Sequence, residues 1–178
     1  MTPLLKITKN VNFITNIRIM RNLTVPIQID GDQIIAQEVL AQIDLWDKAV
    51  VGTNISALVE QCIPDMSMFD VSTQLKNVEE YKTEWEKFSP YFMDGMQISR
   101  REMKLHASDT LAVLHCLSKV EHSALKGKLQ MPWCRTTLCL KKSNNQWRMV
   151  HQHISMPVDM MTGKAVVLKD KPKLRLVV

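Results

Sequence analysis

The chain has 178 residues, 46% of them hydrophobic, which is the usual length of one domain and enough to form a buried core. Residues 1–29 carry four basic residues and no acidic one, and residues 160–178 carry five basic residues and one acidic one. The overall charge of +5 therefore belongs to the two ends, and residues 30–159 are mildly acidic, with 14 basic and 17 acidic residues. This distribution argues against a nucleic-acid groove in the folded part, and no apolar run is long enough to cross a membrane.

Two features of the sequence, its cysteines and its N-terminal segment, indicate the cellular compartment of the protein. The four cysteines lie in apolar or strand-like stretches and show no C-x-x-C spacing; they are Cys62, Cys116, Cys134 and Cys139. We expect them to be reduced, buried thiols, which predicts a cytoplasmic protein. The acid-free segment 1–29 fits an organelle presequence and an extension before an internal start at Met20 equally well, so the sequence leaves both open.

Helical periodicity dominates the first half of the chain. A helix is predicted over about residues 32–51, where apolar residues recur at three- and four-residue steps; they are Ile35, Val39, Ile43, Trp46 and Val50. Asp32 is expected to accept the first backbone N–H groups of this helix. A short second helix follows Asn54, and a third begins at Asn77 with a capping-box pattern and ends before Ser89-Pro90.

Strand patterns fill the rest of the chain. One strand is predicted at Met66–Val71, between the second and third helices. Four more follow the third helix, at about 96–106, 110–121, 131–142 and 146–157, separated by turn-like clusters. The short connections at residues 107–109 and 143–145 predict antiparallel neighbours. Three helices followed by a meander predict an α+β domain with the helices on one face of a curved antiparallel sheet.

The last predicted strand allows a prediction of which side chains share a face. In a regular strand, alternate residues point to the same side. This places Trp147, Met149, His151 and His153 together, on the side covered by the helices. The opposite side mixes apolar and polar groups, as expected of a surface that meets a partner subunit.

Two stretches carry a resemblance to a known fold family. Phe69-Asp70, at the end of the strand after the second helix, resembles the Phe-Asp segment of that family. Residues 135–155 resemble its closing hairpin, an Arg-containing strand followed by a Trp-x-Ile-Val-His-x-His-x-Ser strand. On these grounds residues 30–159 resemble the SnoaL-like, ketosteroid-isomerase-like family of the nuclear-transport-factor-2-like superfamily. Residues 1–29 and 160–178 lie outside the resemblance, as a basic N-terminal extension and a basic C-terminal tail.

The resemblance implies a cone-shaped fold whose open end holds a ligand and whose outer sheet face forms a homodimer. Under this hypothesis Asp70 and His153 are the candidate catalytic residues, since a carboxylate at the mouth of an apolar pocket can act as a base. The residues expected to contact a ligand are Trp46, Trp85, His115, Arg135 and His151.

Each candidate also has a structural explanation. Asp70 can simply cap the loop after its strand, and Arg135 can pair with Glu102 or Glu121. His151 and His153 could share a metal, but no third ligand at a suitable spacing accompanies them, so we predict neither a metal site nor a cofactor. The tyrosines are Tyr81 and Tyr91, and neither occupies the first-helix position of an oxyanion donor, which argues against ketosteroid isomerisation.

The sequence thus predicts a protein that binds a small apolar or amphipathic organic ligand in a central pocket. Cofactor-free isomerase, cyclase or dehydratase chemistry through the Asp and His side chains is compatible with this hypothesis. The alternative is a non-catalytic dimeric binding or assembly module whose pocket is vestigial. The superfamily scaffold hosts both kinds of protein, so the fold alone does not choose between them.

Overall fold

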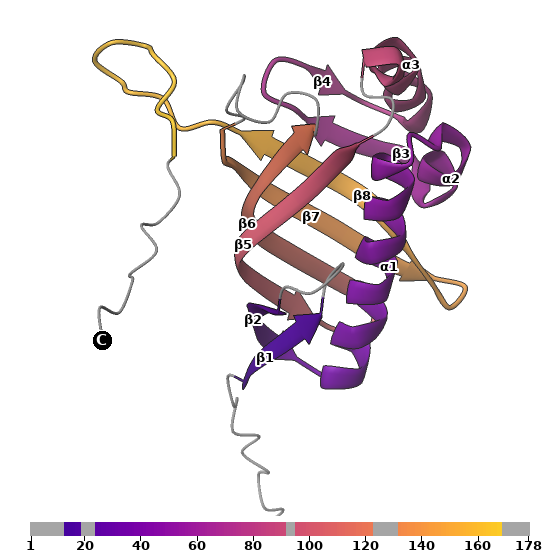
Figure 1. Cartoon of the computed structure of the whole chain (residues 1–178). Coiled ribbons are helices and arrows are strands. Elements are labelled where there is room, and N and C mark those ends of the chain that lie inside the picture. Colours follow the sequence, from indigo (N-terminus) through magenta and orange to yellow (C-terminus); the bar gives the residue numbers. More distant parts are fainter. Residues whose placement is uncertain (1–12, 19–23, 92–94, 123–131, 169–178) are drawn as a thin grey trace, which may run out of the picture.

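A computed structural model describes residues 13–18, 24–91, 95–122 and 132–168 (Figure 1). The helices are α1 (Gln33–Val51), α2 (Ile55–Glu60) and α3 (Val78–Phe88), followed by a single 3-10 turn at Ser89–Tyr91. The strands are β1 (Phe13–Arg18), β2 (Thr24–Gly31), β3 (Cys62–Phe69), β4 (Gln74–Leu75), β5 (Met96–Ala107), β6 (Leu111–His122), β7 (Cys134–Ser143) and β8 (Gln146–Ser155). The three helices and the four long strands of the second half match the prediction.

All described strands join one curved sheet in the order β1-β2-β5-β6-β7-β8-β3-β4. The meander β5 to β8 is antiparallel, as predicted. The sheet as a whole is mixed, because β2 runs parallel to β5 and β3 runs parallel to β8. The expectation of a purely antiparallel sheet is corrected in this respect. The sheet also includes β1 and β2, which lie in the segment 1–29 that the sequence analysis assigned to the N-terminal extension, except for the last two residues of β2.

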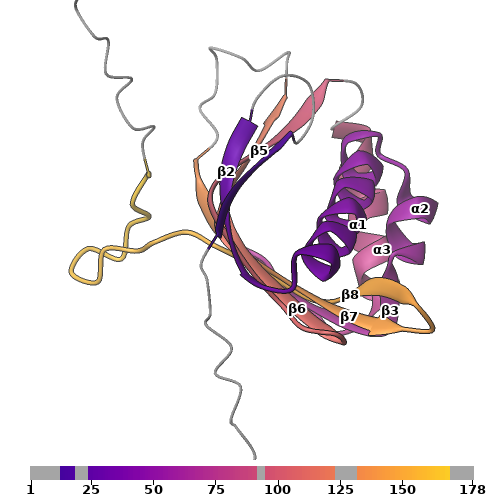
Figure 2. The ribbon, with the colours of Figure 1, turned by 90° about the horizontal axis from the view of Figure 1, so that it is seen from below.

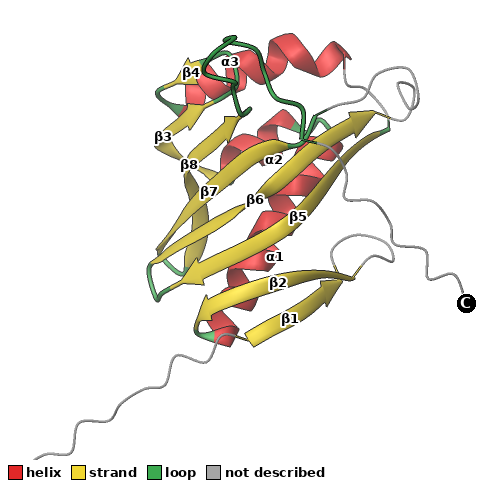
Figure 3. Cartoon of the chain, turned by 90° about the vertical axis from the view of Figure 1, so that its left-hand side faces the viewer, coloured by secondary structure: helices red, strands yellow, loops and turns green. Residues whose placement is uncertain are grey.

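The three helices cover the concave side of the sheet, and α1 lies along its length (Figure 2). The N-cap residue Asp32 accepts hydrogen bonds from the backbone N–H groups of Ile34 and Ile35 through its Oδ1 atom, at 2.8 and 3.0 Å. Val39, Ile43, Trp46 and Val50 are buried against the sheet, as the apolar stripe predicts. We call this side of the sheet the helix side and the opposite side, which faces the viewer in Figure 3, the outer side.

Two β-bulges change which residues point to the helix side. In β8, Cys139 pairs with His151 but the next residue, Leu140, pairs with Met149, so Val150 is an extra residue. The pairing of β5 with β6 shifts in the same way around Glu102, which has a φ of 54°. A bulge adds one residue to one strand, so the alternation of side chains reverses beyond it.

The bulge at Val150 overturns the predicted faces of β8. Trp147 and Met149 are buried on the helix side, as predicted, but beyond the bulge Gln152 is the buried residue. His151 and His153 therefore point to the outer side, and the prediction that they share a face with Trp147 is wrong.

The chain continues past β8 into a hairpin formed by residues 157–168, which extends away on the outer side of the sheet (Figures 1 and 2). Asp159 stabilises its turn by accepting hydrogen bonds from the N–H groups of Met161 and Thr162, at 2.9 and 3.0 Å. Met160 and Met161 at its tip are 90% and 94% exposed. Among the described residues, no helix is long and apolar enough to cross a membrane.

Candidate functional site

The residues predicted to form one site lie on two sides of the sheet. Trp46 on α1 and Trp85 on α3 lie on the helix side, and Asp70 follows the last residue of β3. The predicted residues on the outer side are His115, Arg135, His151 and His153, where strand pairing places His115 and His153 each opposite Thr137. The structure therefore does not bring Asp70, His115 and His153 together around one interior pocket.

The outer residues form a small cluster of rings and polar groups. Phe69 lies edge-on to His151 and His153, with ring centroids 5.1 and 6.1 Å apart. The Nδ1 atom of His151 is 2.8 Å from the hydroxyl of Ser67. Burial lowers the pKa of His151, and the neighbouring His153 lowers it further. His151 is thus a hydrogen-bonded histidine in its neutral form near pH 7.

His115 has a similar setting further along the outer side. Its ring stacks on that of His106, with centroids 5.8 Å apart. Burial lowers the pKa of His115, and the charges of His106 and Lys104 act in the same direction. His106 in turn places its Nδ1 atom 2.9 Å from the carboxylate of Asp30. Burial first, and then the charges of His106 and Lys104, favour the uncharged form of His115.

Asp70 is exposed at the end of β3, where its backbone N–H donates a 2.8 Å hydrogen bond to the carbonyl of Thr73. Its carboxylate contributes to raising the pKa of both Tyr81 and Cys134, which places it within electrostatic range of these two groups. Tyr81 belongs to α3, and Cys134 is opposite Ser118 on the helix side. Met66 and Met68 of β3 are buried on the helix side, and continuation of the same alternation puts Asp70 on that side, at the exposed end of the strand.

Tyr81, Trp46 and Trp85 form an aromatic group beside Asp70. Tyr81 is almost fully buried, and burial raises the pKa of its hydroxyl, while Trp85 and Trp46 act in the opposite direction. The rings of Tyr81 and Trp85 meet edge to face, with centroids 6.4 Å apart. The tyrosine is thus a neutral hydroxyl beside the indole rings of Trp85 and Trp46, although the Nε1 atom of Trp46 makes no hydrogen bond of normal geometry to a described residue.

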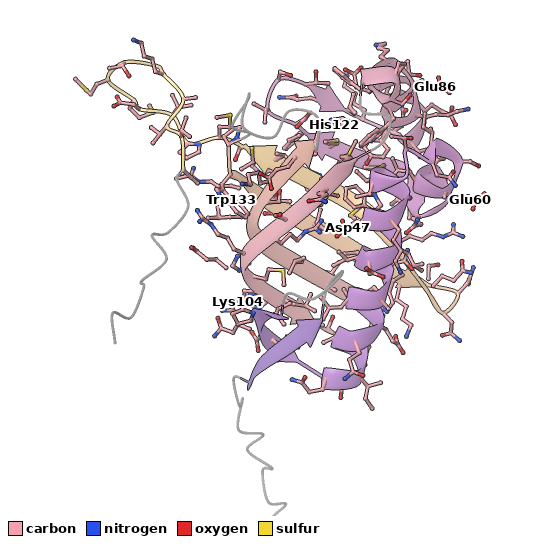
Figure 4. All side chains as sticks on the ribbon, in the orientation of Figure 1. Asp47, Glu60, Glu86, Lys104, His122 and Trp133 are labelled. Atoms are coloured by element: carbon pink, nitrogen blue, oxygen red, sulfur yellow. The ribbon has the colours of Figure 1, made fainter. Side chains whose placement is uncertain are left out.

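A buried ion pair on the helix side was not predicted from the sequence. The guanidinium of Arg100 donates two parallel hydrogen bonds to the carboxylate of Asp47, from Nη1 to Oδ2 and from Nη2 to Oδ1, the latter at 2.7 Å. The two side chains are only 6% and 3% exposed. Figure 4 labels Asp47 between α1 and the sheet. Burial alone would lower the pKa of Arg100, but the charge of Asp47 outweighs it and raises the pKa, so we treat the two groups as a neutral ion pair.

Further polar side chains extend this pair across the helix side. Cys116 lies next to Arg100; burial raises the pKa of its thiol to about 11, although Arg100 opposes the rise. On the neighbouring strands, the hydroxyls of Ser118 and Thr136 are 2.5 Å apart. Gln152 is buried next to Leu138 and Met68. We call Asp47, Arg100, Cys116, Ser118, Thr136 and Gln152 the polar band.

Three buried polar atoms on the helix side find no hydrogen-bond partner within the described part of the chain. They are the Nε1 atom of Trp46, the Nε atom of Arg100 and the Oε1 atom of Gln152. A buried polar group without a partner costs about 1–3 kcal/mol. Native proteins tolerate few such groups, and a bound ligand is one way to satisfy them.

His122 is a second residue that the sequence analysis missed. It ends β6, where it pairs with the buried Met96, and strand alternation puts it on the same side as Val120, which packs against the core. Figure 4 shows it at the end of the strand. It is the one histidine of the described residues on the helix side, because His106, His115, His151 and His153 all point outward.

A groove of about 1100 Å³ runs elsewhere, between α1, α2 and the β7–β8 turn. None of the predicted site residues lines it. Several of its polar groups pair with one another: Glu38 accepts hydrogen bonds from Lys142 at 2.6 Å and from Trp147 at 3.1 Å, and Gln42 donates to Gln61 at 3.0 Å. We therefore place the candidate site on the helix side rather than in this groove. The described residues contain no group of three or more side chains suited to hold a metal ion.

Solved structures with the same fold come from several bacteria. A nuclear-transport-factor-2-like protein of unknown function from Pseudomonas putida is 28% identical, covers 79% of this chain and 100% of its own, and superposes with a TM-score of 0.68. A nuclear-transport-factor-2-like protein from Novosphingobium aromaticivorans, with a cystatin-like fold, is 14% identical. Its match covers 68% of this chain and 80% of its own, with a TM-score of 0.59. A protein from Shewanella frigidimarina, provisionally described as a ketosteroid isomerase, is 16% identical. Its match covers 65% of this chain and 92% of its own, with a TM-score of 0.55.

The sequence comparisons agree with the fold. No curated protein matches the chain significantly. The profile of the SnoaL-like domain matches residues 39–159, which is more than half of the chain and nearly the span that the sequence analysis gave to the domain. The protein therefore belongs to the SnoaL-like domain family and has the nuclear-transport-factor-2-like fold.

Proposed function

We propose that the protein binds a small amphipathic organic molecule between the helices and the concave side of the sheet. The observation that carries the proposal is the set of three buried, unpartnered polar atoms on Trp46, Arg100 and Gln152. They lie among apolar side chains, and such a surface suits a ligand with an apolar body and a few polar atoms. The helix-side residues that provide the apolar surface are Met66, Met68, Met96, Ile98, Trp85, Val120 and Ile154.

Proton transfer on such a ligand would fall to Asp70. The alternation of β3 supports a position of this carboxylate on the helix side, and its charge raises the pKa of Tyr81 and of Cys134. His153 points to the outer side, so the proposed pairing of Asp70 with His153 in one acid–base step is replaced by a proposal that uses Asp70 alone. A general base needs only a substrate proton within hydrogen-bond reach.

An uncharged apolar probe tests the binding site. We expect N-phenylnaphthylamine to bind the wild-type chain saturably, with a rise in its fluorescence on entering an apolar site. Ile154→Trp adds a large ring on the helix side, and overpacking should weaken binding by about tenfold or more. Fluorescence titration gives the dissociation constants of the probe for the wild type and for Ile154→Trp.

The matched control is Val113→Trp, which adds the same ring to the outer side, where Val113 pairs with Cys139. This variant should bind the probe like the wild type. Equal binding by all three proteins, or no saturable binding by the wild type, would contradict the site.

We further propose that two copies pair through the outer side of the sheet. No described helix covers this side, and Phe69 and Leu111 are each about half exposed on it. The hairpin of residues 157–168 also extends from this side, with its two exposed methionines at the tip. This surface fits equally the alternative function, a dimeric assembly module, so dimerisation does not depend on ligand binding.

Protonation of the outer histidines should weaken this dimer. The pKa values of His115 and His151 lie below the ordinary value of 6.5, so both rings are neutral at pH 7.5 and become charged as the pH falls below 6.5. In a two-fold interface these charges would meet like charges, including Lys104 and Arg135. We expect light scattering to give a dimer mass at pH 7.5 and a larger monomer fraction at pH 5.5.

Substitution of His115 and His151 by Gln should reduce this pH dependence. His122→Gln, on the helix side, is the control and should keep it. A monomer at both pH values would contradict the dimer proposal, and a dimer that is indifferent to pH would contradict the role of the histidines.

A further inference from the structure

The hairpin of residues 157–168, which we call the arm, is formed by local interactions. The backbone N–H of Asp159 donates a 2.9 Å hydrogen bond to the carbonyl of Lys164 across the turn. A bridge between Leu168 and Trp133 ties the base of the arm to the sheet, next to the start of β7. The arm thus leaves the sheet from a fixed point with a defined shape.

Beyond its base the arm buries none of its side chains. All residues from 158 to 167 are exposed, although half of them are apolar or nearly so. The large apolar side chains among them are Val158, Met160, Met161, Val166 and Val167. A two-stranded hairpin that packs against nothing is only marginally stable in water. Its apolar surface therefore indicates a partner that covers it.

A matching apolar surface lies at the end of the sheet from which the arm leaves. β3 and β8 run parallel, and Phe69 at the end of β3 pairs with His153, two residues before the end of β8. Phe69 and Val71 are each about half exposed, and we call these two residues the Phe69 surface. Methionine side chains adapt to irregular apolar surfaces and pack favourably against aromatic rings. The tip of the arm and the Phe69 surface are thus chemically compatible.

The length of the arm suits a second copy of the chain. The arm extends on the outer side of the sheet (Figure 2), where we propose that two copies pair. Sheets packed face to face lie about 10 Å apart, and four steps of about 3.3 Å from Pro157 to Met161 give a reach of up to about 13 Å. In a two-fold dimer that keeps like ends of the two sheets together, the tip therefore meets the Phe69 surface of the facing copy, and the contact occurs twice.

We infer that two copies exchange their arms, so that Met160 and Met161 of each copy pack against Phe69 and Val71 of the other. The inference rests on the proposed dimer and names the element that holds it together. Asp70 lies between the two residues of the Phe69 surface. The arm of one copy would therefore also border the carboxylate that we propose as a base in the other copy.

Removal of the two thioethers should weaken the dimer. The double variant Met160→Ser with Met161→Ser changes exposed side chains only, and thermal unfolding checks that it folds like the wild type. Sedimentation equilibrium of the full-length chain at pH 7.5 should give it a dimer dissociation constant at least about tenfold above that of the wild type. The matched control is Ile34→Ser, which removes a similarly exposed apolar side chain from α1 and should leave the constant unchanged.

Disulfide cross-linking tests the exchange directly. A chain with Met161→Cys is co-expressed with a chain with Val71→Cys, and the purified protein is oxidised mildly. We expect a covalent dimer on a non-reducing gel, with a disulfide between positions 161 and 71 of different chains identified by mass spectrometry. Ile34→Cys in place of Val71→Cys is the control, and it should give no disulfide to position 161.

The outcomes separate the arm from the dimer itself. A weakened dimer in the methionine variant together with the cross-link between positions 161 and 71 supports the inference. A methionine variant that dimerises like the wild type, or a wild-type dimer whose cysteine variants form no such cross-link, overturns the exchange while the dimer stands. A wild-type chain that stays monomeric at pH 7.5 overturns both.

Discussion

Replacing Arg100 alone by Met should destabilise the protein by about 3–5 kcal/mol, because it leaves the carboxylate of Asp47 buried without its partner. The Asp47→Leu single variant leaves the guanidinium buried instead and should cost a similar amount. The double variant should lose far less stability. In it two apolar side chains replace an ion pair whose attraction was largely offset by the cost of removing both charges from water.

Urea denaturation of the wild type and the three variants measures this double-mutant cycle. The loss caused by Arg100→Met should shrink as the pH is lowered, because the orphaned carboxyl can then be protonated and buried neutral. Exposed Lys48, which pairs with Asp44 on the same helix, gives the control pair, and Lys48→Met should change stability by less than about 1 kcal/mol. Additive losses in the cycle would show that the two buried groups do not act as a pair.

Gly31→Ala should be the most damaging glycine substitution among the glycines that the structure describes. Gly31 ends β2 with a φ of +131°, which L-amino acids rarely adopt, and an added Cβ would lie 2.0 Å from the carbonyl oxygen of Ala107. Because that oxygen belongs to the backbone of β5, relief requires a shift of the β2–β5 pairing where the chain enters α1. We expect the positive φ alone to lower the free energy of unfolding by about 3 kcal/mol. The clash between the new Cβ and the Ala107 carbonyl should lower it further.

Gly163→Ala is the matched control. Gly163 has a φ of +66° in the turn of the C-terminal hairpin, and nothing lies within 4 Å of the position that its Cβ would take. This variant should carry only the conformational cost of about 1 kcal/mol. Thermal unfolding gives the melting temperatures of Gly31→Ala and Gly163→Ala. Equal values would show that the Cβ at position 31 does not clash with Ala107.

The fold was predictable where one local pattern covers a whole element. The apolar stripe of α1 and its Asp32 cap are both present, and the short turns between β5 and β6 and between β7 and β8 do produce antiparallel pairs. The parallel pairing of β2 with β5 was not predictable, since it joins segments about 75 residues apart and no turn between them fixes the register.

The candidate site was harder to predict because bulges carry no simple sequence pattern. Arg100 and Arg101 are adjacent, and alternation alone does not say which of them enters the core. Glu102 adopts its positive φ although it is not a glycine, so the residue type gives no warning of the bulge. Asp47 is a charged residue beside the apolar stripe of α1, and its burial becomes understandable only when Arg100 is seen opposite it.

The extra residue in β8 also has a consequence for divergence within this fold. If Val150 were deleted, Met149 would still pair with Leu140 and His151 with Cys139, so the strand would become regular while His151, Gln152 and His153 kept their present sides. A relative that keeps every residue of this stretch but has no bulge would instead hold both histidines in the layer beneath the helices. The same C-terminal motif therefore supports different interior chemistry according to whether its strand is bulged or regular.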